Sequence, residues 1–296
     1  MAQTQTLQRR IRSVKNAGQI TKALEVVAAS RMRRIQDSVA KVRHYAELAD
    51  SIMRRISTSQ EAAHHPYFRP GVGKEKLYVV FTSDRGQAGA FNSNVFNMAH
   101  KSFLQDKAAG LRPSVIVFGR KGSSHFSHID GIELAGAYED IADVPEANVF
   151  APALGAIRTG MAEGRFNSVQ IIYTQFKSSL LQQAQQIQLL PITMDQTSQP
   201  DQTEKDEVPN KVYEFEPNTE AVLEESLRLY FEARLMAVRI ESAASEHAMR
   251  MVAMGNAHRN ASDLADDLTL ELNTVRQAAI TQEIAEIVGG ASAIAQ

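Results

Sequence analysis

The chain of 296 residues contains no cysteine and no tryptophan, and its 32 Lys and Arg nearly balance its 34 Asp and Glu. Without cysteine, the chain has no disulfide, no thiolate metal site, no iron–sulfur cluster and no cysteine nucleophile. It also lacks the long apolar run of a transmembrane helix. Its N-terminus has no apolar signal core, and the basic amphipathic pattern there continues into the following segment. We therefore expect a soluble chain, or one that another protein holds at a membrane.

Proline and glycine are scarce at both ends of the chain. All nine prolines lie in residues 66–217, and twelve of the sixteen glycines lie in 71–164. Residues 1–65 and 218–288 contain one glycine each and no proline. Because these residues interrupt helices, their scarcity predicts two long terminal helices. Average helices have only about 11–12 residues, so uninterrupted segments of this length are typical of a coiled coil.

Apolar spacing and charge support a pair of wrapped helices. Apolar or small residues of the first segment recur mostly in steps of three and four, as in a coiled-coil seam. They are Leu7, Ile11, Val14, Ala17, Leu24, Ala28, Ile35, Val39, Val42, Ala46, Ala49, Met53 and Ile56. The last segment has a less regular seam at Leu223, Leu227, Leu235, Val238, Val252, Leu264, Leu268, Val275, Ala279, Ile284 and Ile287.

Net charge differs between the two ends. The first 60 residues carry twelve basic and four acidic side chains, whereas residues 218–296 carry twelve acidic side chains and six arginines. Opposite charge favours an antiparallel pair of terminal helices that closes over a central insert, although two solvated helix faces would show the same composition.

The centre of the chain reads as an α/β domain. Short runs rich in β-branched and aromatic residues predict four strands, at 76–82, 114–118, 168–176 and 183–192. Residues 91–109 and 146–163 are predicted helices. Alternation of strands and helices indicates a mostly parallel, Rossmann-like sheet covered on its faces. The predicted fold class is thus α/β plus a long antiparallel coiled coil.

This pattern divides the chain into four segments. Residues 195–210 are polar, acidic and contain proline, which predicts a mobile loop. The expected organisation is an N-terminal coiled-coil helix, a central α/β domain, a mobile acidic loop and a C-terminal coiled-coil helix, at 1–60, 70–195, 196–212 and 213–290.

One segment of the centre resembles a ligand-binding turn. Residues 83–92 (SDRGQAGAFN) follow a predicted strand and open a predicted helix, where backbone N–H groups can hold a phosphate. The turn Asp84, Arg85, Gly86 and Gly89 has neither the GxGxxG spacing nor the Lys-Ser/Thr of a P-loop. A tight strand-to-helix turn that needs glycine torsions explains it better than nucleotide binding.

Other chemistry-bearing patterns are weak. His64, His65, His125 and His128 lack partner ligands at helical spacing, and Asp263, Asp266 and Asp267 read as a solvated acidic face. No catalytic grouping is identifiable, so we predict no catalytic residue, no cofactor and no metal. Arg31, Arg33 and Arg34 would suit phosphate backbones, but aromatics and base readers are missing beside them, which argues against nucleic acid.

Three segments together resemble the γ subunit of F-type ATP synthases. Residues 10–34 (RIRSVKNAGQITKALEVVAASRMRR) resemble its N-terminal helix, and residues 83–92 resemble its central motif. Residues 241–254 (ESAASEHAMRMVAM) and 273–290 (NTVRQAAITQEIAEIVGG) resemble its C-terminal helix. The three motifs occur in order and at matching separations over nearly the whole chain.

The resemblance implies a rotor shaft without an active site. In this family the paired terminal helices are an axle inside a ring of three catalytic and three non-catalytic subunits, the α3β3 ring. The α/β domain lies at the foot, against an ε-type subunit and the c-subunit ring of the membrane sector. Rotation driven by proton or sodium flow carries the catalytic subunits through states that bind, form and release ATP. The implied place is that of a peripheral membrane protein at the cytoplasmic face of a bacterial plasma membrane, without direct bilayer insertion. An organellar inner membrane is the alternative, and the sequence does not decide between the two.

The resemblance also assigns residues. Arg276, Gln277, Thr281 and Glu283 match positions near the upper contact with catalytic subunits. Lys22 and Leu24 match the part of the first helix that meets an acidic lever loop; the family commonly has Met at Leu24. Tyr213 and Glu216 match foot residues that face the ring, in a loose alignment. The family's central motif usually reads Gly-Leu-Cys-Gly, whereas this chain has Gly86-Gln87-Ala88-Gly89.

Two readings from other classes remain open on the sequence alone. An α/β nucleotide-binding enzyme with a coiled-coil arm would show its own ATPase activity. A basic coiled-coil nucleic-acid binder would show steeply salt-dependent affinity for DNA. The coupling ion, the control of hydrolysis and the effect of Gly18 inside the first helix are not readable from the sequence.

Overall fold

The computed structural model of the protein describes residues 2–56, 65–192 and 219–294. Its elements follow in the order α1 (Ala2–Ile56), η1 (Pro66–Phe68), β1 (Glu75–Phe81), α3 (Phe91–Ala108), β2 (Arg112–Phe118), α4 (Arg120–Phe126), β3 (Glu133–Tyr138), η2 (Ala147–Phe150), α5 (Ala151–Ala162), β4 (Phe166–Phe176), β5 (Gln182–Leu190) and α6 (Thr219–Ile294). They form two compact units, Met1–Ala29 with Arg250–Gln296, and Ser30–Met249. The expected mobile loop at 196–212 lies outside the described residues, and the four-segment division stays a prediction.

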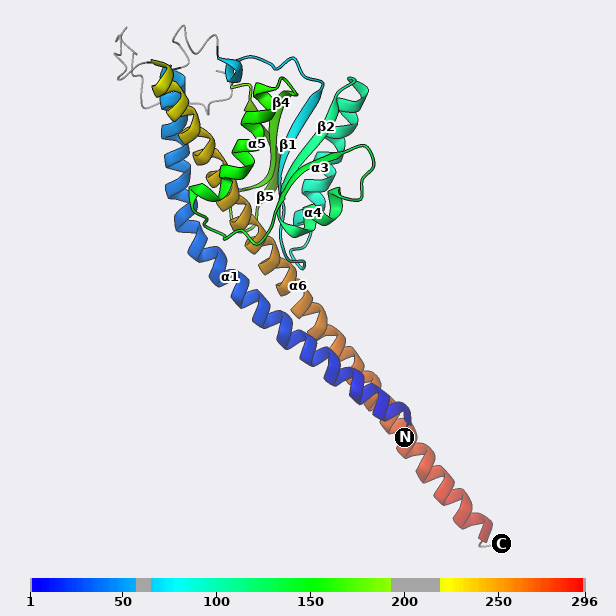
Figure 1. Ribbon diagram of the computed structural model, residues 1–296. Coiled ribbons are helices and arrows are strands. Elements are labelled where there is room, and N and C mark those ends of the chain that lie inside the picture. The colour runs from blue at the N-terminus through cyan, green and yellow to red at the C-terminus, as the bar shows by residue number, and fades with distance from the viewer. Residues whose placement is uncertain (1, 57–64, 193–218, 295–296) are drawn as a thin grey trace. The chain divides into compact units, whose positions relative to one another are not determined.

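The larger unit is built on a five-stranded sheet in the order β3-β2-β1-β4-β5. The first four strands are parallel, with β1 paired to β2 and β4, whereas β5 runs antiparallel to β4. The predicted mostly parallel sheet is therefore confirmed. Figure 1 shows α3 and α4 on one face of this sheet and α5 on the other.

Two elements escaped the sequence analysis. Strand β3 reads Glu-Leu-Ala-Gly-Ala-Tyr, and it contains no β-branched residue, so its propensity for strand is poor. It forms because β2 offers a parallel partner beside it. Helix α4 has only seven residues, too few for a periodic signal.

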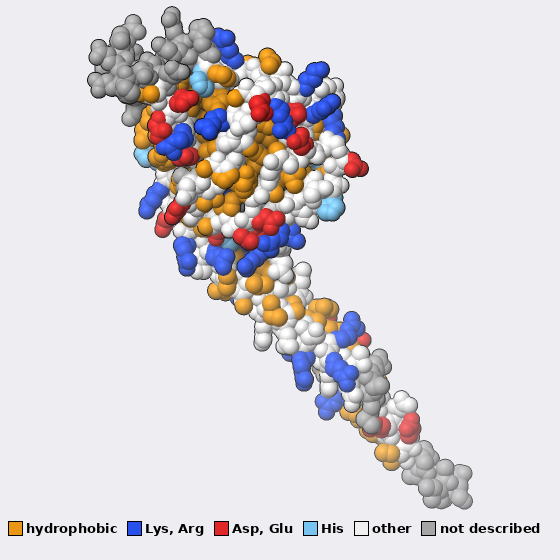
Figure 2. Space-filling model, viewed as in Figure 1, with side chains coloured by type: hydrophobic (Ala, Val, Ile, Leu, Met, Phe, Trp, Pro, Cys, Tyr) orange, Lys and Arg blue, Asp and Glu red, His pale blue; other side chains and the backbone are white. Residues whose placement is uncertain are grey.

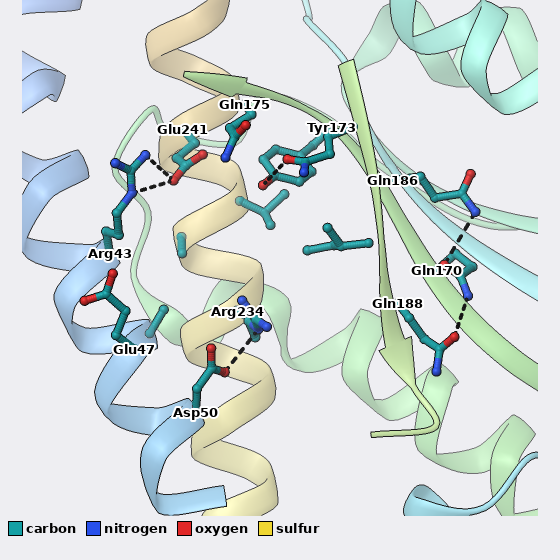
Figure 3. Close-up of a pocket in the computed structure, with 15 residues that line it drawn as sticks. Arg43, Glu47, Asp50, Gln170, Tyr173, Gln175, Gln186, Gln188, Arg234 and Glu241 are labelled. Atoms are coloured by element: carbon teal, nitrogen blue, oxygen red, sulfur yellow. Dashed lines mark hydrogen bonds and ion pairs between the residues drawn. The ribbon is translucent and has the colours of Figure 1, made fainter. Parts of the chain in front are cut away.

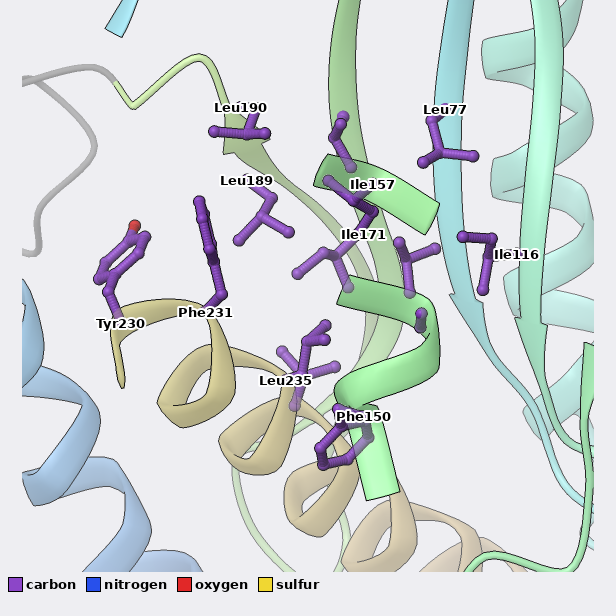
Figure 4. Close-up of a cluster of buried hydrophobic side chains, with 14 of the residues drawn as sticks. Leu77, Ile116, Phe150, Ile157, Ile171, Leu189, Leu190, Tyr230, Phe231 and Leu235 are labelled. Carbon is purple, nitrogen blue, oxygen red and sulfur yellow. The ribbon is translucent and has the colours of Figure 1, made fainter. Parts of the chain in front are cut away.

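Each face of the sheet has its own apolar core. Side chains that alternate along β1 separate into the two clusters: Leu77, Val79 and Phe81 face α5 and α6, whereas Tyr78 and Val80 face α3 and α4. Figure 4 shows the first cluster, in which Phe231 and Leu235 of α6 lie toward β4 and β5. Helix α6 is therefore part of the core of this unit as well as a partner of α1.

Within the larger unit, α1 and α6 pair through the predicted seam. Ile35, Val39, Ala46, Met53 and Ile56 of α1 are all buried, as the three-and-four spacing predicts. Two ion pairs join the helices: Arg43–Glu241 (2.9 Å), in which α1 supplies the cation, and Asp50–Arg234 (3.3 Å), in which α1 supplies the anion.

The excess positive charge of α1 is directed to solvent. All ten Lys and Arg side chains of α1 that the structure describes are exposed, and blue side chains stand along the helices in Figure 2. Apolar burial, more than charge complementarity, therefore holds the two helices together.

The smaller unit is an antiparallel helix pair with close contacts at its glycines. The carbonyl of Gly18 lies 2.9 Å from Nδ1 of His258. A Cβ added at Gly18 would lie 3.4 Å from Cβ of Ala261, and one added at Gly255 would lie 3.4 Å from Cδ of Glu25. These two glycines of the long helices thus lie where the partner helix approaches, which accounts for a residue that helix propensity disfavours.

Truncating a core residue of α6 tests its role in the larger unit. We expect Leu235→Ala to lower the free energy of unfolding by about 2–5 kcal/mol, because Leu235 is fully buried and its loss leaves a cavity. Urea unfolding of the purified chain, followed by circular dichroism, measures this. The matched control Leu229→Ala, at a side chain that is 41% exposed on the same helix, should change it by less than about 0.5 kcal/mol. Equal effects of the two variants would contradict this account of the core.

Candidate interaction surfaces

The predicted contact on α1 lies on an exposed part of the smaller unit. Lys22 is exposed and pairs with Glu25 at 3.2 Å, one turn along the helix. Leu24 is partly buried. Beside them, Ile20, Val26 and Val27 are 61%, 58% and 50% exposed. These three residues were not predicted as a contact. The adjacent pair Val26-Val27 could have indicated one, because neighbouring helix positions do not lie on the same face and both cannot be buried in one seam.

The predicted contact on α6 is exposed along its whole length. Arg276, Gln277, Thr281 and Glu283 all have exposed side chains, and the Thr281 hydroxyl donates to the Gln277 carbonyl at 2.9 Å. The structure brings these four residues together on about two turns of helix. Their contacts with partner subunits stay a prediction.

Among the described residues of the smaller unit, no residue of α1 lies opposite the end of α6. The contacts of Gly18 with His258 and Ala261, and of Gly255 with Glu25, set an antiparallel register. In this register the start of α1 comes opposite α6 at about residues 274–278. Figure 1 shows the red end of α6 continuing beyond the N-terminus of α1. Apolar side chains on this part are exposed: Ile280, Ile284, Ile287 and Val288 are 46–72% exposed.

Four residues of the predicted α6 seam are not buried, for two different reasons. Val252, Leu264, Ile284 and Ile287 were expected to be buried in the seam, but they are 39%, 47%, 56% and 72% exposed. Leu268 of the predicted seam is buried, and so are Met254 and Ala265, which the predicted seam did not include. The last two seam residues lie where α1 has already ended, and the first two lie off the face that α1 covers.

The central turn, residues 83–90, lies at the carboxyl end of β1, where its polar groups bond to one another. The Asn92 amide accepts from the Ser83 backbone N–H at 3.0 Å and donates to the Ser83 hydroxyl at 2.8 Å. The Asp84 carboxylate accepts from the backbone N–H groups of Arg120 and Asp140, at 3.0 and 3.2 Å. Asp84 therefore joins the ends of β1, β2 and β3.

Glycine has different roles at the two ends of this turn. Gly89 has a φ of 57°, in the left-handed region, as expected for a turn that needs glycine. Gln87 also adopts a left-handed φ of 64°. Gly86 has ordinary torsions, and a Cβ there would meet only the Lys121 side chain at 3.9 Å. Arg85 and Gly86 are exposed at the tip of the turn.

Buried polar contacts join the loop after β3 to α6. They were not predicted from the sequence. Asp143 Oδ2 lies 2.9 Å from Nε2 of His247, which is 4% exposed. Arg239 donates to the Ile141 carbonyl at 2.7 Å. No local spacing signals this contact, because its partners are about a hundred residues apart in the chain.

Asp143 has a lowered pKa. Burial by itself raises the pKa of this carboxyl, but the hydrogen bond to His247 lowers it, and so do the charges of His247 and Arg239. The sum leaves the pKa below its ordinary value.

Two of the histidines considered as metal ligands, His65 and His125, make other contacts in the structure. His100 and His125 face one another with Nε2 atoms 2.9 Å apart, and burial followed by the charge of His100 lowers the pKa of His125. His65 caps η1 by accepting from the Tyr67 N–H at 3.3 Å. The described residues contain no group of three or more His, Asp or Glu side chains able to hold a metal. His64, Tyr213 and Glu216 lie outside the described residues.

Comparison with known proteins identifies the family. A family model described as ATP synthase matches residues 3–294. The ATP synthase gamma chain of Pelotomaculum thermopropionicum is 36% identical over 99% of this chain and 100% of its own length. The gamma chain of Chloroflexus aurantiacus is 38% identical over 99% of each chain. The chain belongs to the ATP synthase gamma chain family.

Solved structures of ATP synthase share the fold. A chain of the central stalk and c-ring of the Tetrahymena thermophila mitochondrial ATP synthase superposes with a TM-score of 0.62 at 24% identity, over 80% of this chain and 99% of that one. A chain of the Euglena gracilis mitochondrial ATP synthase rotor gives 0.64 at 18% identity, over 94% and 99%. The family predicted from three sequence motifs is thus confirmed, as is the combination of sheet and paired helices. Within the described ranges, none of the helices has the length and apolar character needed to cross a bilayer.

The contact between Asp143 and His247 predicts pH-dependent stability. Because the folded state lowers the pKa of Asp143, its contribution is present above the unfolded pKa of about 3.9 and is lost as pH falls through the folded value. We expect Asp143→Asn to reduce the free energy of unfolding by about 1–3 kcal/mol at pH 7, and by progressively less below pH 4. Chemical unfolding at a series of pH values measures this.

The control for this prediction is Asp130→Asn, at an exposed carboxylate on the same unit. It should stay within about 0.5 kcal/mol of the unmodified chain at every pH. A deficit of Asp143→Asn that is the same at pH 3 and pH 7 would contradict the assignment.

Proposed function

We propose that this chain is the non-catalytic rotor shaft of an F-type ATP synthase, which couples ion-driven rotation of a membrane ring to ATP synthesis or hydrolysis at the catalytic subunits. The observation that carries the proposal is the identity of 36–38% to gamma chains over 99% of this chain. The proposed partners are the α and β subunits of the α3β3 ring, an ε-type subunit and the c-subunit ring. The two gamma chains named above come from Pelotomaculum thermopropionicum and Chloroflexus aurantiacus, and the proposed place is accordingly the cytoplasmic face of a bacterial plasma membrane.

The end of α6 supports a contact with an enclosing ring. Exposed apolar side chains at Ile280, Ile284 and Ile287 cost free energy in water, and a surrounding protein surface would cover them. Arg276, Gln277 and Glu283 add exposed hydrogen-bonding groups on the same stretch. A mixture of apolar side chains and a few polar ones permits contact without a permanent anchor, as a shaft that turns past several surfaces requires.

The exposed positive charge of α1 supports a second contact. Lys22 and the other described basic side chains of α1 are directed to solvent, where they would attract acidic loops of catalytic subunits. Such attraction is screened by salt. Coupling then follows because each catalytic subunit meets a different face of the shaft, and only a difference in contact between its states can shift its equilibrium.

The central turn is proposed as a further contact of the larger unit. Asp84 holds the turn by accepting two backbone N–H groups, so the exposed tip at Arg85 and Gly86 is presented on a fixed support. Gly86 needs no glycine torsion, so its missing side chain leaves room for a partner to approach. Tyr213 and Glu216 stay proposed contacts with the membrane ring.

Hydrolysis of ATP by the assembled head tests the function as a whole. The measurement compares purified α and β subunits with and without this chain, and the chain alone serves as the control. We expect rapid sustained hydrolysis only when all three are present, and no hydrolysis by the chain alone. A chain lacking Gln277–Gln296 should assemble poorly with these subunits. Hydrolysis by the chain alone would instead support an enzyme, with the turn at Gly86–Gly89 as the site to change.

A double variant tests the contact near the end of α6. We expect Arg276→Ala with Gln277→Ala to weaken binding of the chain to the α3β3 ring about tenfold, because a hydrogen bond to a charged group contributes about 1.5 kcal/mol or more. Titration of labelled chain into the ring measures the affinity. Asn273→Ala, at an exposed position one turn earlier, is the control and should bind normally. Unchanged affinity of the double variant would remove these residues from the contact.

A further inference from the structure

A polar cleft of about 690 Å³ separates the long helices from the end of the sheet in the larger unit. Arg43, Asp50, Arg234 and Glu241 line one side, from α1 and α6 (Figure 3). The other side follows β4 and β5, and it is rich in side-chain amides: Gln170, Gln175, Gln185, Gln186 and Gln188. Gln175 and Gln185 lie on the face toward α6, whereas Gln170, Gln186 and Gln188 lie on the face toward α3, where the Ser102 hydroxyl donates to Gln186 at 2.6 Å. The cleft therefore extends around the edge of the sheet at β5. Gln186 donates to Gln170 at 3.5 Å and Gln170 donates to Gln188 at 3.3 Å (Figure 3). An amide has two donor hydrogens and an oxygen with two lone pairs, so these side chains keep capacity for a ligand that both donates and accepts.

The strand beside the cleft has an open edge. Among the described residues, β5 is the last strand of the sheet, and its one partner strand there is β4. Edge strands of natural proteins are usually protected by charged residues, proline or a covering segment, because their backbone groups can pair with another chain. The sequence of β5, Gln182–Leu190, contains neither a charged residue nor proline. Its glutamines extend the hydrogen-bonding surface instead of blocking it.

One carboxylate oxygen at the cleft lacks a donor. Glu241 is 8% exposed, and its Oε1 accepts from Nε and NH2 of Arg43 at 3.2 and 2.9 Å. Its Oε2 is buried without a hydrogen-bond partner among the described residues. A buried carboxylate oxygen without a donor is costly, so this atom favours a ligand that brings a cationic donor.

The charges at the cleft argue against an anionic ligand. Both arginines already pair with carboxylates, Arg43 with Glu241 and Arg234 with Asp50. Glu47 adds a third acid, so the lining carries one more negative than positive charge. A phosphate or nucleotide would have to displace an existing ion pair, whereas a Lys or Arg side chain would not.

The size of the cleft fits a short strand. A residue within a sheet occupies roughly 160 Å³, from its rise of about 3.4 Å, the strand spacing of about 4.8 Å and the thickness of about 10 Å. The cleft therefore holds about four residues of extended chain. We propose that an extended segment of another subunit, carrying a Lys or Arg side chain, adds to the sheet along β5 and places that side chain at Glu241. This inference rests on the proposed function in that the segment belongs to a subunit of the same complex.

Backbone pairing would supply the affinity, and the charged side chain would supply the selectivity. Strand addition gives hydrogen bonds that do not depend on sequence, and side chains on alternate residues then select the partner. Here the selecting group is Glu241, and Tyr173 and Gln185 beside it make a polar surround in which the Tyr173 hydroxyl donates to the Gln185 amide oxygen at 3.4 Å.

Site-directed photocrosslinking in the purified complex tests the proposal. Because the chain has no cysteine, Gln185→Cys introduces a single thiol that a benzophenone maleimide can label. We expect one predominant crosslink to an extended, Lys- or Arg-containing segment of one subunit, identified by mass spectrometry. Gln105→Cys, at an exposed glutamine of α3 on the opposite side of the sheet, is the control and should not capture that segment. Equal capture at both positions, or none at Gln185→Cys, would overturn the proposal.

Hydrogen exchange needs no variant and gives an independent result. We expect amides of β5 to exchange at least tenfold more slowly in the complex than in the free chain, and Glu241→Gln to reduce the crosslink about tenfold in a complex of unchanged composition. Unchanged exchange of β5 in a complete complex would overturn this inference and leave the proposed function standing. A chain that joins no complex would refute both.

Discussion

The structure depends on eleven consecutive residues of α6, Val238–Ala248, all of which are buried. A helix on the surface of a protein buries one stripe and exposes the rest, whereas burial on every side requires neighbours all round. Here the neighbours are α1, the face of the sheet built by β4, and the loop after β3. This stretch makes α6 a common element of the helix pair and the sheet, so that neither can be displaced in the larger unit without opening the core.

Burial on every side also fixes what the polar residues of this stretch must do. Ser245 donates to the Thr174 carbonyl, Arg239 to the Ile141 carbonyl, and Glu241 accepts from Arg43. Each of these bonds reaches a different neighbour, so each specifies how α6 is rotated about its own axis. Apolar packing alone tolerates small rotations of a helix, but a set of directed bonds to three surroundings does not.

The sequence predicted much of this fold, and the exceptions have physical reasons. Scarce proline and glycine indicated two long helices, and β-branched runs such as 114–118 indicated buried strands, because both signals are local. Strand β3 was missed because Ala135, Gly136 and Ala137 have little preference for strand and depend on pairing with β2. The contact between Asp143 and His247 was not predicted, because its two residues lie far apart in the sequence.

Some candidate contacts were predictable from the sequence, and others needed the three-dimensional structure. Arg276 and Lys22 were found by motif resemblance, and the structure places both at the surface. The cleft at Glu241 was not predictable, because it needs the positions of α1, α6 and β5 together. Val252 and Leu264 show the limit of periodicity: spacing identifies apolar positions but does not say which of them a partner helix covers.

The unpaired end of α6 has a mechanical consequence. Resistance of a rod to bending rises steeply with the width of its cross-section, so two helices packed side by side are much stiffer than either alone. Beyond about residue 278 of the smaller unit the cross-section falls from two helices to one. This end of α6 is therefore the compliant part of that unit, and a sideways force on it is absorbed as elastic bending before it reaches the paired region around Gly18.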